Sequence, residues 1–141
     1  MAKKVVIIGG VAAGMKTASR LRRRDKDAEI TVVERGQQVS YGACGFPYYI
    51  GGDVKDFSSF THTPQWFARD AEFFKNVKGF DVVTGHEAQK IDRANKTVTV
   101  MDKATGAIQE MSYDVLVLGT GATPVKLSLP GAELGGIHNF W

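Results

Sequence analysis

The sequence predicts an α/β fold with a parallel sheet and an inserted antiparallel β-meander, and three observations predict it. An apolar, β-branched run from Lys3 to Ile8 leads directly into a glycine-rich turn and a helical stretch from Met15 to Arg24. A second apolar run, from Glu29 to Glu34, follows at the spacing of a βαβ unit, so the two strands should pair in parallel with a right-handed crossover. Residues 86–113 alternate apolar strands with polar turns, which is typical of antiparallel strands.

The composition excludes several classes of protein. The 141 residues suit one domain with its own core. The net charge of +3 is mild and its basic residues cluster only locally, so we expect no nucleic-acid partner. A single cysteine cannot form an internal disulfide, which indicates a reducing, cytoplasmic location. The N-terminal VVII run imitates a signal peptide, but no segment approaches the roughly 20 apolar residues of a membrane span.

The middle of the chain predicts a long loop followed by a helix. Residues 36–62 are irregular and rich in Gly, Ser and aromatic residues, and a loop of this length within a compact domain usually has a function. Thr63 is the predicted cap of a helix with Pro64 at its first position, ending at Gly79. Its apolar side would consist of Trp66, Phe67, Phe73 and Phe74.

The GGVAAG turn nearly satisfies the glycine fingerprint of dinucleotide-binding sites. The first glycine permits the tight turn and Gly14 permits close packing of helix on strand, while Val11 occupies the middle position beside Gly10. Backbone N–H groups at the helix start would then hold a pyrophosphate. Glu34, at the end of the second strand, could accept hydrogen bonds from a ribose diol and would repel a 2′-phosphate. The alternatives are a purely structural turn and a solvated strand end.

A second strand also runs directly into glycine and threonine. In YDVLVLGTGATP the predicted strand Asp114 to Leu118 precedes Gly119 and Thr120, which lets the backbone pass close to a ligand. Alone it fits any strand-to-loop junction. Together with GGVAAG, it indicates that both elements abut one dinucleotide. The short segment FDVVTG predicts a further strand.

Two other features have both a functional and a structural interpretation. Cys44 precedes GFPYYI, which could start a helical turn whose N-terminus favours a thiolate, although a lone cysteine is more often buried and structural. Lys16, Arg20 and Arg23 share one helical face, flanked by Arg22 and Arg24. This face is either solvated or a site for ligand phosphates. The wide spacing of His62, His86 and His138 predicts no metal site.

A family resemblance over the whole chain rests on three blocks in order. They are VVIIGGVAAG, SYGACGFPYYIGG and YDVLVLGTGATP with LPG close behind. The sequence resembles the FAD-binding part of pyridine nucleotide–disulfide oxidoreductases. It is most similar to their single-cysteine branch of coenzyme A-disulfide reductases, NADH-dependent persulfide or polysulfide reductases and NADH oxidases, where a Gly-Gly-Val-Ala turn is typical. The resemblance implies a Rossmann-like FAD-binding domain over residues 1–141, with residues 86–113 inserted in it.

The resemblance also implies a role for individual residues. The FAD pyrophosphate would lie over the glycine turn, its ribose on Glu34 and its flavin near Cys44. The implied cofactor contacts are Gly9, Gly10, Val11, Ala12, Ala13, Gly14, Glu34, Arg35, Ser40, Glu87, Ala88, Thr120, Gly121 and Ala122. Dithiol relatives use C-x4-C, and here the second position is Tyr49. Cys44 would therefore be the catalytic residue and form a mixed disulfide, persulfide or sulfenic acid with an external partner.

The substrate is left open among several sulfur compounds and oxygen. The resemblance implies that Ser40 shapes the thiol pocket and that Lys16, Arg20 and Arg23 contact a coenzyme A-linked substrate. Many coenzyme A-disulfide reductases have an asparagine directly before the cysteine, and Ala43 at that position favours persulfide or polysulfide reduction. The alternatives are an NADH oxidase working through a sulfenic acid and a non-catalytic FAD- or nucleotide-binding module.

The family also implies parts that these residues do not include. NAD(P)H would be bound by a domain outside this chain, and a C-terminal dimerisation domain would make the intact enzyme a homodimer. We therefore expect the 141 residues alone to turn over NADH poorly.

The two tyrosines after Cys44 have two interpretations. Tyr48 and Tyr49 would pack against flavin or cysteine, or belong to the core.

Overall fold

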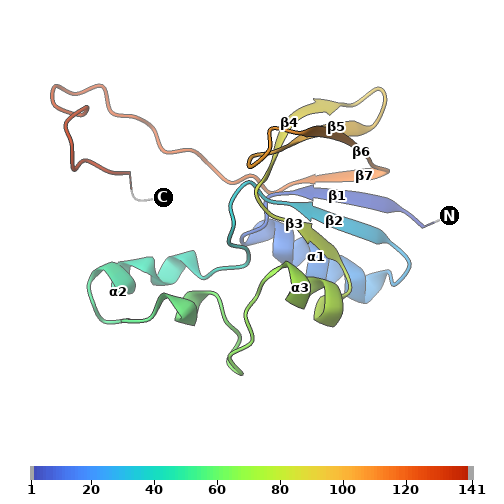
Figure 1. Cartoon of the computed structure of the whole chain (residues 1–141), viewed down its shortest axis with the longest axis horizontal. Helices are drawn as coiled ribbons and strands as arrows, with labels where there is room; N and C mark the ends of the chain where they lie inside the picture. The colour runs from blue at the N-terminus through green and yellow to red at the C-terminus, as the bar shows by residue number, and fades with distance from the viewer. Residues whose placement is uncertain (1, 140–141) are drawn as a thin grey trace.

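The computed structural model describes residues 2–139 and contains two sheets (Figure 1). The first is parallel, with strand order β3-β2-β1-β7, and the second is antiparallel, with order β4-β5-β6. The strands of the parallel sheet are β1 (Lys4–Ile8), β2 (Glu29–Val33), β3 (Asp81–Val83) and β7 (Val115–Leu118). The antiparallel strands are β4 (His86–Asp92), β5 (Thr97–Asp102) and β6 (Ile108–Ser112). The predicted α/β class with an inserted meander is confirmed.

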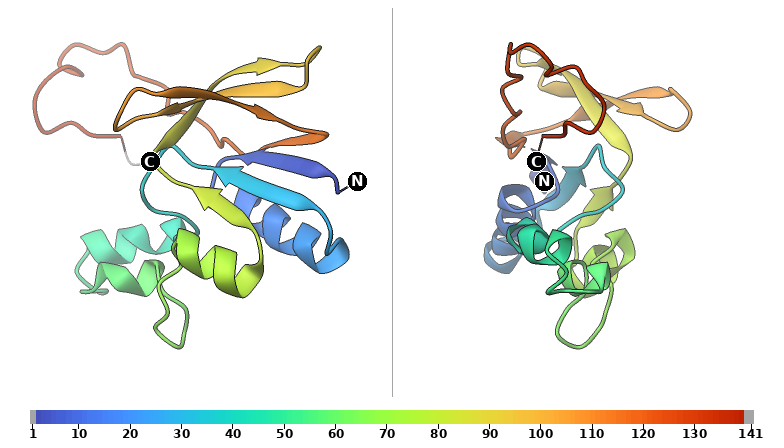
Figure 2. Two further views of the ribbon diagram at one scale, coloured as in Figure 1. Left: turned by 45° about the vertical axis from the view of Figure 1, so that its right-hand side comes forward. Right: turned by 90° about the vertical axis from the view of Figure 1, so that its left-hand side faces the viewer.

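The parallel sheet lies between a layer of helices and the antiparallel sheet (Figures 1 and 2). Helix α1 (Ala13–Arg24) returns the chain from β1 to β2, and its Met15 and Ala18 are buried. Successive side chains of a strand point to opposite faces, so β1 contributes to two cores. Val5 and Ile7 belong to the core on the helix side, whereas Val6 packs with Val98 and Val100 of the meander. Burial on both faces explains why β1 is a continuous apolar run rather than an alternating one.

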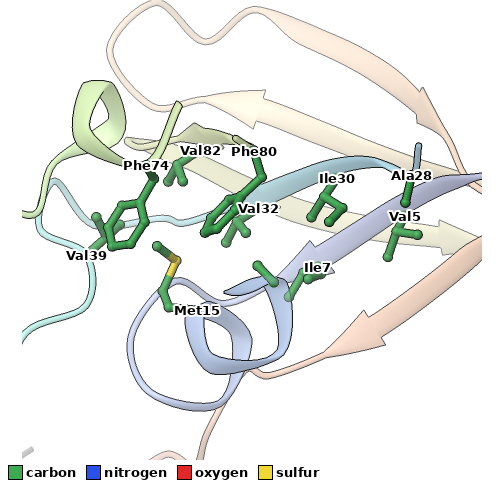
Figure 3. Close-up of a cluster of buried hydrophobic side chains, with 11 residues drawn as sticks. Val5, Ile7, Met15, Ala28, Ile30, Val32, Val39, Phe74, Phe80 and Val82 are labelled. Carbon is green, nitrogen blue, oxygen red and sulfur yellow. The ribbon is translucent and has the colours of Figure 1, made fainter. Parts of the chain in front are cut away.

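The helix-side core joins segments that are distant in the sequence (Figure 3). Met15 from α1 lies near Val39 and Phe74, while Phe80 and Val32 occupy the centre of the cluster. The Phe74 and Phe80 rings stack with their centroids 5.4 Å apart. Val39 is the last buried residue before the chain leaves the sheet region, so it fixes the start of the long segment that follows.

The meander is closed by well-formed turns. Asp92 accepts hydrogen bonds from the backbone N–H and the side-chain amide of Asn95, both at 2.9 Å. These hydrogen bonds, the backbone one first, hold the pKa of Asp92 below its usual value. Lys96 then adopts a left-handed conformation with φ 51°, which completes the reversal between β4 and β5.

The predicted helix start at Thr63 is wrong. Thr63 instead closes a tight hairpin, because its hydroxyl accepts the Phe67 N–H at 3.1 Å and an antiparallel bridge joins His62 to Ala68. Trp66 at the tip is left-handed, with φ 61°. Its side chain and that of Phe67 are 61% and 64% exposed, so neither belongs to an apolar helix face. A local side-chain hydrogen bond has therefore outcompeted helix formation at this threonine.

The helix begins seven residues later, at α3 (Ala71–Phe73), which continues as a π-helical turn from Phe74 to Lys78. Asp70 is its cap, accepting the Phe73 N–H at 2.8 Å. The predicted end at Gly79 is confirmed, since this residue is left-handed with φ 76°. Of the four aromatic residues predicted for the helix, only Phe73 and Phe74 pack inward.

The predicted irregular stretch contains short helical elements that project from the sheet (Figure 2). They are the 3₁₀ turn η1 (Ala43–Gly45), helix α2 (Phe46–Ile50) and the 3₁₀ turn η2 (Phe57–Phe60). None of the helices within residues 2–139 has the length and apolarity to cross a membrane.

We expect Phe74→Ala to lower the free energy of unfolding by about 3–5 kcal/mol, because it empties a filled position in the helix-side core. Phe67→Ala is the matched control and should change it by no more than about 0.5 kcal/mol, since that ring is exposed. Urea unfolding followed by circular dichroism measures both. Equal effects of the two substitutions would contradict the assignment of this core.

Candidate functional site

The glycine turn brings β1, α1 and the end of β7 into backbone contact. Gly9 has φ 106°, and its N–H donates to the Val33 carbonyl at 2.8 Å. A Cβ on Gly9 would strike the Gly119 carbonyl, and a Cβ on Gly14 would strike the Gly9 carbonyl. Gly119 is held in place by its own N–H, which donates to Ile8 at 2.7 Å. The two glycine-rich signals of the sequence therefore lie together at the carboxyl edge of the sheet.

The start of α1 has the properties of an anion site. Ala12 at its N-cap makes no side-chain hydrogen bond, and the first turn contains no acidic residue. The first N–H groups of a helix have no intrahelical acceptor, and the helix dipole favours negative charge beside them. Val11, Ala12 and Ala13 add no large polar side chain here, so the backbone is accessible to a phosphate group.

Glu34 ties this turn to the end of β2. One carboxylate oxygen accepts the Gly10 N–H and the other accepts the Gly36 N–H, each at 2.7 Å. Gly10 is packed so closely that an added Cβ would come within 2.8 Å of the Glu34 Cβ. A carboxylate offers about four lone-pair positions, so two remain for hydroxyl donors of a ligand. Glu34 thus combines a structural contact with the acceptors that a ribose needs.

The first residues of the meander lie beside Glu34. His86 donates its backbone N–H to the Glu34 carbonyl at 3.0 Å, which places the following Glu87 and Ala88 next to the end of β2. Arg35 accepts a hydrogen bond at its carbonyl from the Lys103 ammonium at 3.4 Å. Glu87 and Ala88 are half-buried, whereas Arg35 is exposed.

On the other side of the glycine turn, Ser40 starts a groove against α1. Its N–H donates to the Gly10 carbonyl at 2.8 Å, and its φ of 53° is unusual for a residue with a side chain. The groove has a volume of about 250 Å³ and is lined by Val11, Ala12, Met15, Lys16, Ser19, Ser40 and Tyr41. Sequence reasoning missed Ser19 and Tyr41, although Ser19 lies one helical turn after Lys16.

An open surface depression of about 610 Å³ lies along α1 and shares Lys16 with this groove. Its lining consists of Lys16, Thr17, Arg20, Leu21, Arg23 and Arg24, so the predicted basic face is assembled. Arg22 does not contribute to it, because its guanidinium donates to the carbonyls of Asp25, Lys26 and Ala28. The two depressions meet at Lys16, with an open basic end on α1 and a narrower end at Ser40 and Tyr41.

Cys44 lies in η1, three residues after this narrower end, and its side chain is exposed. The alternative of a buried structural cysteine is therefore wrong. The surrounding segment is aromatic: Tyr41 stacks on Phe46 with centroids 5.6 Å apart, and Tyr49 makes edge contacts with Phe57 and Phe60. Tyr48 faces solvent instead.

The remaining predicted contacts follow β7. Thr120, Gly121 and Ala122 are exposed and come directly after Gly119, which contacts the glycine turn. Gly121 is left-handed, with φ 70°, so the chain bends away from the sheet at this point. The structure thus brings the glycine turn, Glu34, Ser40 and Gly119 together, with the cysteine segment and the meander on either side.

Comparison with known proteins gives this arrangement a context. Residues 3–140 match the sequence profile of the family described as pyridine nucleotide-disulphide oxidoreductase. A coenzyme A disulfide reductase of Staphylococcus haemolyticus is 39% identical over 139 residues, which are 98% of this chain and 30% of that protein. An NADH oxidase of Methanocaldococcus jannaschii is 36% identical over 135 residues, which are 95% of this chain and 28% of that protein. The chain therefore spans less than a third of the length of these relatives.

Solved structures show the same fold. A NAD-dependent persulfide reductase from A. fulgidus superposes with a TM-score of 0.89 and 48% identity, over 94% of this chain and 24% of that one. Reduced Bacillus anthracis CoADR-RHD gives a TM-score of 0.82 with 36% identity, over 94% and 23%. A water-forming NADH oxidase from Lactobacillus brevis, bound to NADH, gives 0.83 with 31% identity, over 95% and 28%.

We expect Gly9→Ala to destabilise the protein more than Gly52→Ala does. Both glycines have positive φ, so each substitution incurs the same kind of backbone strain, about 1–2 kcal/mol. A Cβ at Gly52 would meet open space, whereas one at Gly9 would strike the Gly119 backbone and add about 1–3 kcal/mol. Urea unfolding measures the difference, and equal losses would show that the backbone contact is not required.

Proposed function

Because the chain belongs to the pyridine nucleotide-disulphide oxidoreductase family, we propose that it forms the FAD-binding domain of an enzyme that reduces disulfide, persulfide or polysulfide sulfur through Cys44. Family members bind FAD and use NAD(P)H as the reductant. We assign NAD(P)H binding and the contacts of a homodimer to parts of the protein outside residues 1–141. The exposed thiol of Cys44, close in sequence to the groove at Ser40 and Tyr41, carries the proposal.

The residues present fit an extended dinucleotide. A pyrophosphate fits the close-packed glycine turn and the first N–H groups of α1, which have no side-chain cap. A ribose diol fits the two acceptor positions that remain on Glu34. We propose that the glycine turn, Glu34, Arg35 and Ser40 contact FAD from one side. Glu87, Ala88, Thr120, Gly121 and Ala122 would complete the contacts. Residues 86–113 are then an insertion that supports the adenine end.

When bound, FAD supplies the two electrons that reduce an oxidised sulfur at Cys44. The chain's own contribution is nucleophilic: the Cys44 thiolate attacks one sulfur of the substrate, an S–S bond forms, and the other sulfur leaves as a thiol or sulfide. Since Tyr49 occupies the position of a second cysteine, the C-x4-C partner that would resolve this bond is missing here. On this proposal the mixed disulfide or persulfide is resolved by reduction instead.

The basic depression along α1 favours a coenzyme A-linked substrate. Lys16, Arg20 and Arg23 line it, and cations of this kind bind phosphate groups. Its continuation to Ser40 and Tyr41 would direct the thiol end of such a ligand towards the cysteine segment. Ala43 presents no polar side chain beside Cys44, which favours a persulfide or polysulfide over a strict preference for coenzyme A disulfide.

A second candidate is an NADH oxidase in which Cys44 cycles through a sulfenic acid. The exposure of the thiol favours it, because a small oxidant can reach the sulfur directly. The M. jannaschii and L. brevis relatives are both described as NADH oxidases. Both reactions are consistent with the cytoplasmic, reducing location inferred from the single cysteine.

We expect Cys44→Ser in the full-length protein to abolish NAD(P)H-dependent reduction of coenzyme A disulfide, coenzyme A persulfide and polysulfide. Flavin content should stay unchanged, because the exposed side chain packs in no core. NADH consumption on these three substrates and on oxygen is the measurement. If the variant keeps all four activities, Cys44 is not the catalytic thiol. If the wild-type protein turns over oxygen faster than the three sulfur substrates, the oxidase is favoured.

We expect the double substitution of Arg20 and Arg23 by glutamine to raise KM for coenzyme A persulfide by about tenfold, since two contacts of exposed guanidinium groups with phosphate are together worth about 1–2 kcal/mol. KM for polysulfide, which has no phosphate, should not change. Arg93→Gln, in the exposed turn after β4, is the matched control. An equal rise in both KM values would contradict a phosphate-binding role.

A further inference from the structure

The segment that carries Cys44 has one buried residue, Phe60. Within residues 40–62 every other side chain is exposed or half-buried, and Phe60 is 9% exposed. The segment projects from the sheet and contacts the glycine turn through the Ser40 N–H at its start (Figure 2). The position of Cys44 must therefore depend on what holds Phe60 at the other end.

The Phe60 ring packs directly under the cysteine turn. A Cβ added to Gly45, the residue after Cys44, would clash with Cε1 and Cδ1 of the Phe60 ring. The same ring makes edge contacts with Phe46, Phe57 and Tyr49, at centroid distances of 5.6, 5.8 and 6.1 Å. Close-packed interiors transmit small displacements, so a shift of this ring would move the turn that contains the thiol.

The Phe60 backbone is held from both sides. Its carbonyl accepts the Gly42 N–H at 3.0 Å and also a guanidinium N–H of Arg69. Arg69 in turn donates its backbone N–H to the Thr61 carbonyl at 2.8 Å. It directly precedes Asp70, the cap of α3, whose Phe73 packs against the helix-side core. Arg69 therefore connects the projecting segment to the body of the domain.

We propose that Arg69 and Phe60 are positioning residues for Cys44, acting through an Arg69–Phe60–Gly45 brace. Its catalytic meaning rests on the proposed function of Cys44. Electron transfer to a sulfur held by Cys44 requires that sulfur to lie in a fixed geometry against the cofactor, and a displacement of about 1 Å can cost about 100-fold in rate. The brace would hold the Cys44 thiol in place although its own side chain is exposed.

The test separates the two half-reactions of the flavin-loaded, full-length protein by stopped-flow absorbance. NADH reduces the flavin in the first half-reaction, and polysulfide reoxidises it in the second. Arg69→Met should slow reoxidation by about 10- to 100-fold while flavin reduction by NADH and flavin content stay unchanged. Arg69→Lys keeps one cationic donor and should recover part of the rate. Arg93→Met, an exposed arginine outside the brace, should match the wild type.

Cys44→Ser in the same experiment separates this proposal from the proposed function. If Cys44→Ser blocks reoxidation and Arg69→Met does not slow it, the brace is overturned and the function of Cys44 stands. If Cys44→Ser reoxidises at the wild-type rate, the proposed function is wrong and the brace falls with it. Equal slowing of both half-reactions by Arg69→Met would show a merely structural role and also overturn the proposal.

If Arg69→Met does not fold, a second pair of variants tests whether Phe60 and Gly45 position Cys44. Gly45→Ala pushes directly on the Phe60 ring without touching Arg69, and should slow reoxidation alone. Adding Phe60→Leu removes the ring that the new methyl group strikes, so the double variant should reoxidise faster than Gly45→Ala. No recovery in the double variant would overturn the brace, because the two positions would then act independently.

Discussion

The structure depends on one close contact of backbone with backbone, where Gly9 meets Gly119 and Gly14 meets Gly9. Three elements from distant parts of the sequence converge there, and neither Gly9 nor Gly14 has room for a Cβ. The contact brings the carboxyl ends of β1 and β7 together with the start of α1, and so creates the crevice in which α/β sheets bind ligands. The Glu34 carboxylate then fixes the turn against β2 through Gly10. The grooves along α1 and the cysteine segment are positioned relative to this point.

Much of the fold and the centre of the site could be predicted from local patterns. The composition of the run from Lys3 to Ile8 predicts the buried strand found at Lys4–Ile8, and Gly9 after it adopts a positive φ that glycine reaches most easily. Glu34 was recognisable because an acid at the end of the second strand stands at a fixed place relative to that turn. These features rest on the composition of one element or on the fixed spacing within one βαβ unit, so the sequence pattern reports them directly.

Residues 61–79 show what such patterns miss. Thr63 followed by Pro64 has every local mark of a helix start, yet the threonine hydroxyl accepts the Phe67 N–H within a hairpin. Asp70 offers an equally good cap seven residues later, where Phe73 and Phe74 can reach the core. The helix starts at the cap that allows Phe73 and Phe74 to pack inward, and which side chains can be buried depends on the whole fold. Arg22 is a similar case, because its place on the basic helix does not reveal that three carbonyls at the helix end take its guanidinium.

The same distinction separates the two halves of the candidate site. The proposed dinucleotide half consists largely of backbone groups whose positions follow from the pairing of β1 with β2 and β7. The sulfur half lies on a segment whose single buried side chain is Phe60, held by Arg69 from outside the segment. A redox thiol must be exposed to meet an external sulfur compound, and an exposed thiol cannot be fixed by its own burial. Its geometry must then be supplied by neighbours, and for this reason we propose that an arginine 25 positions away from Cys44 bears on its chemistry.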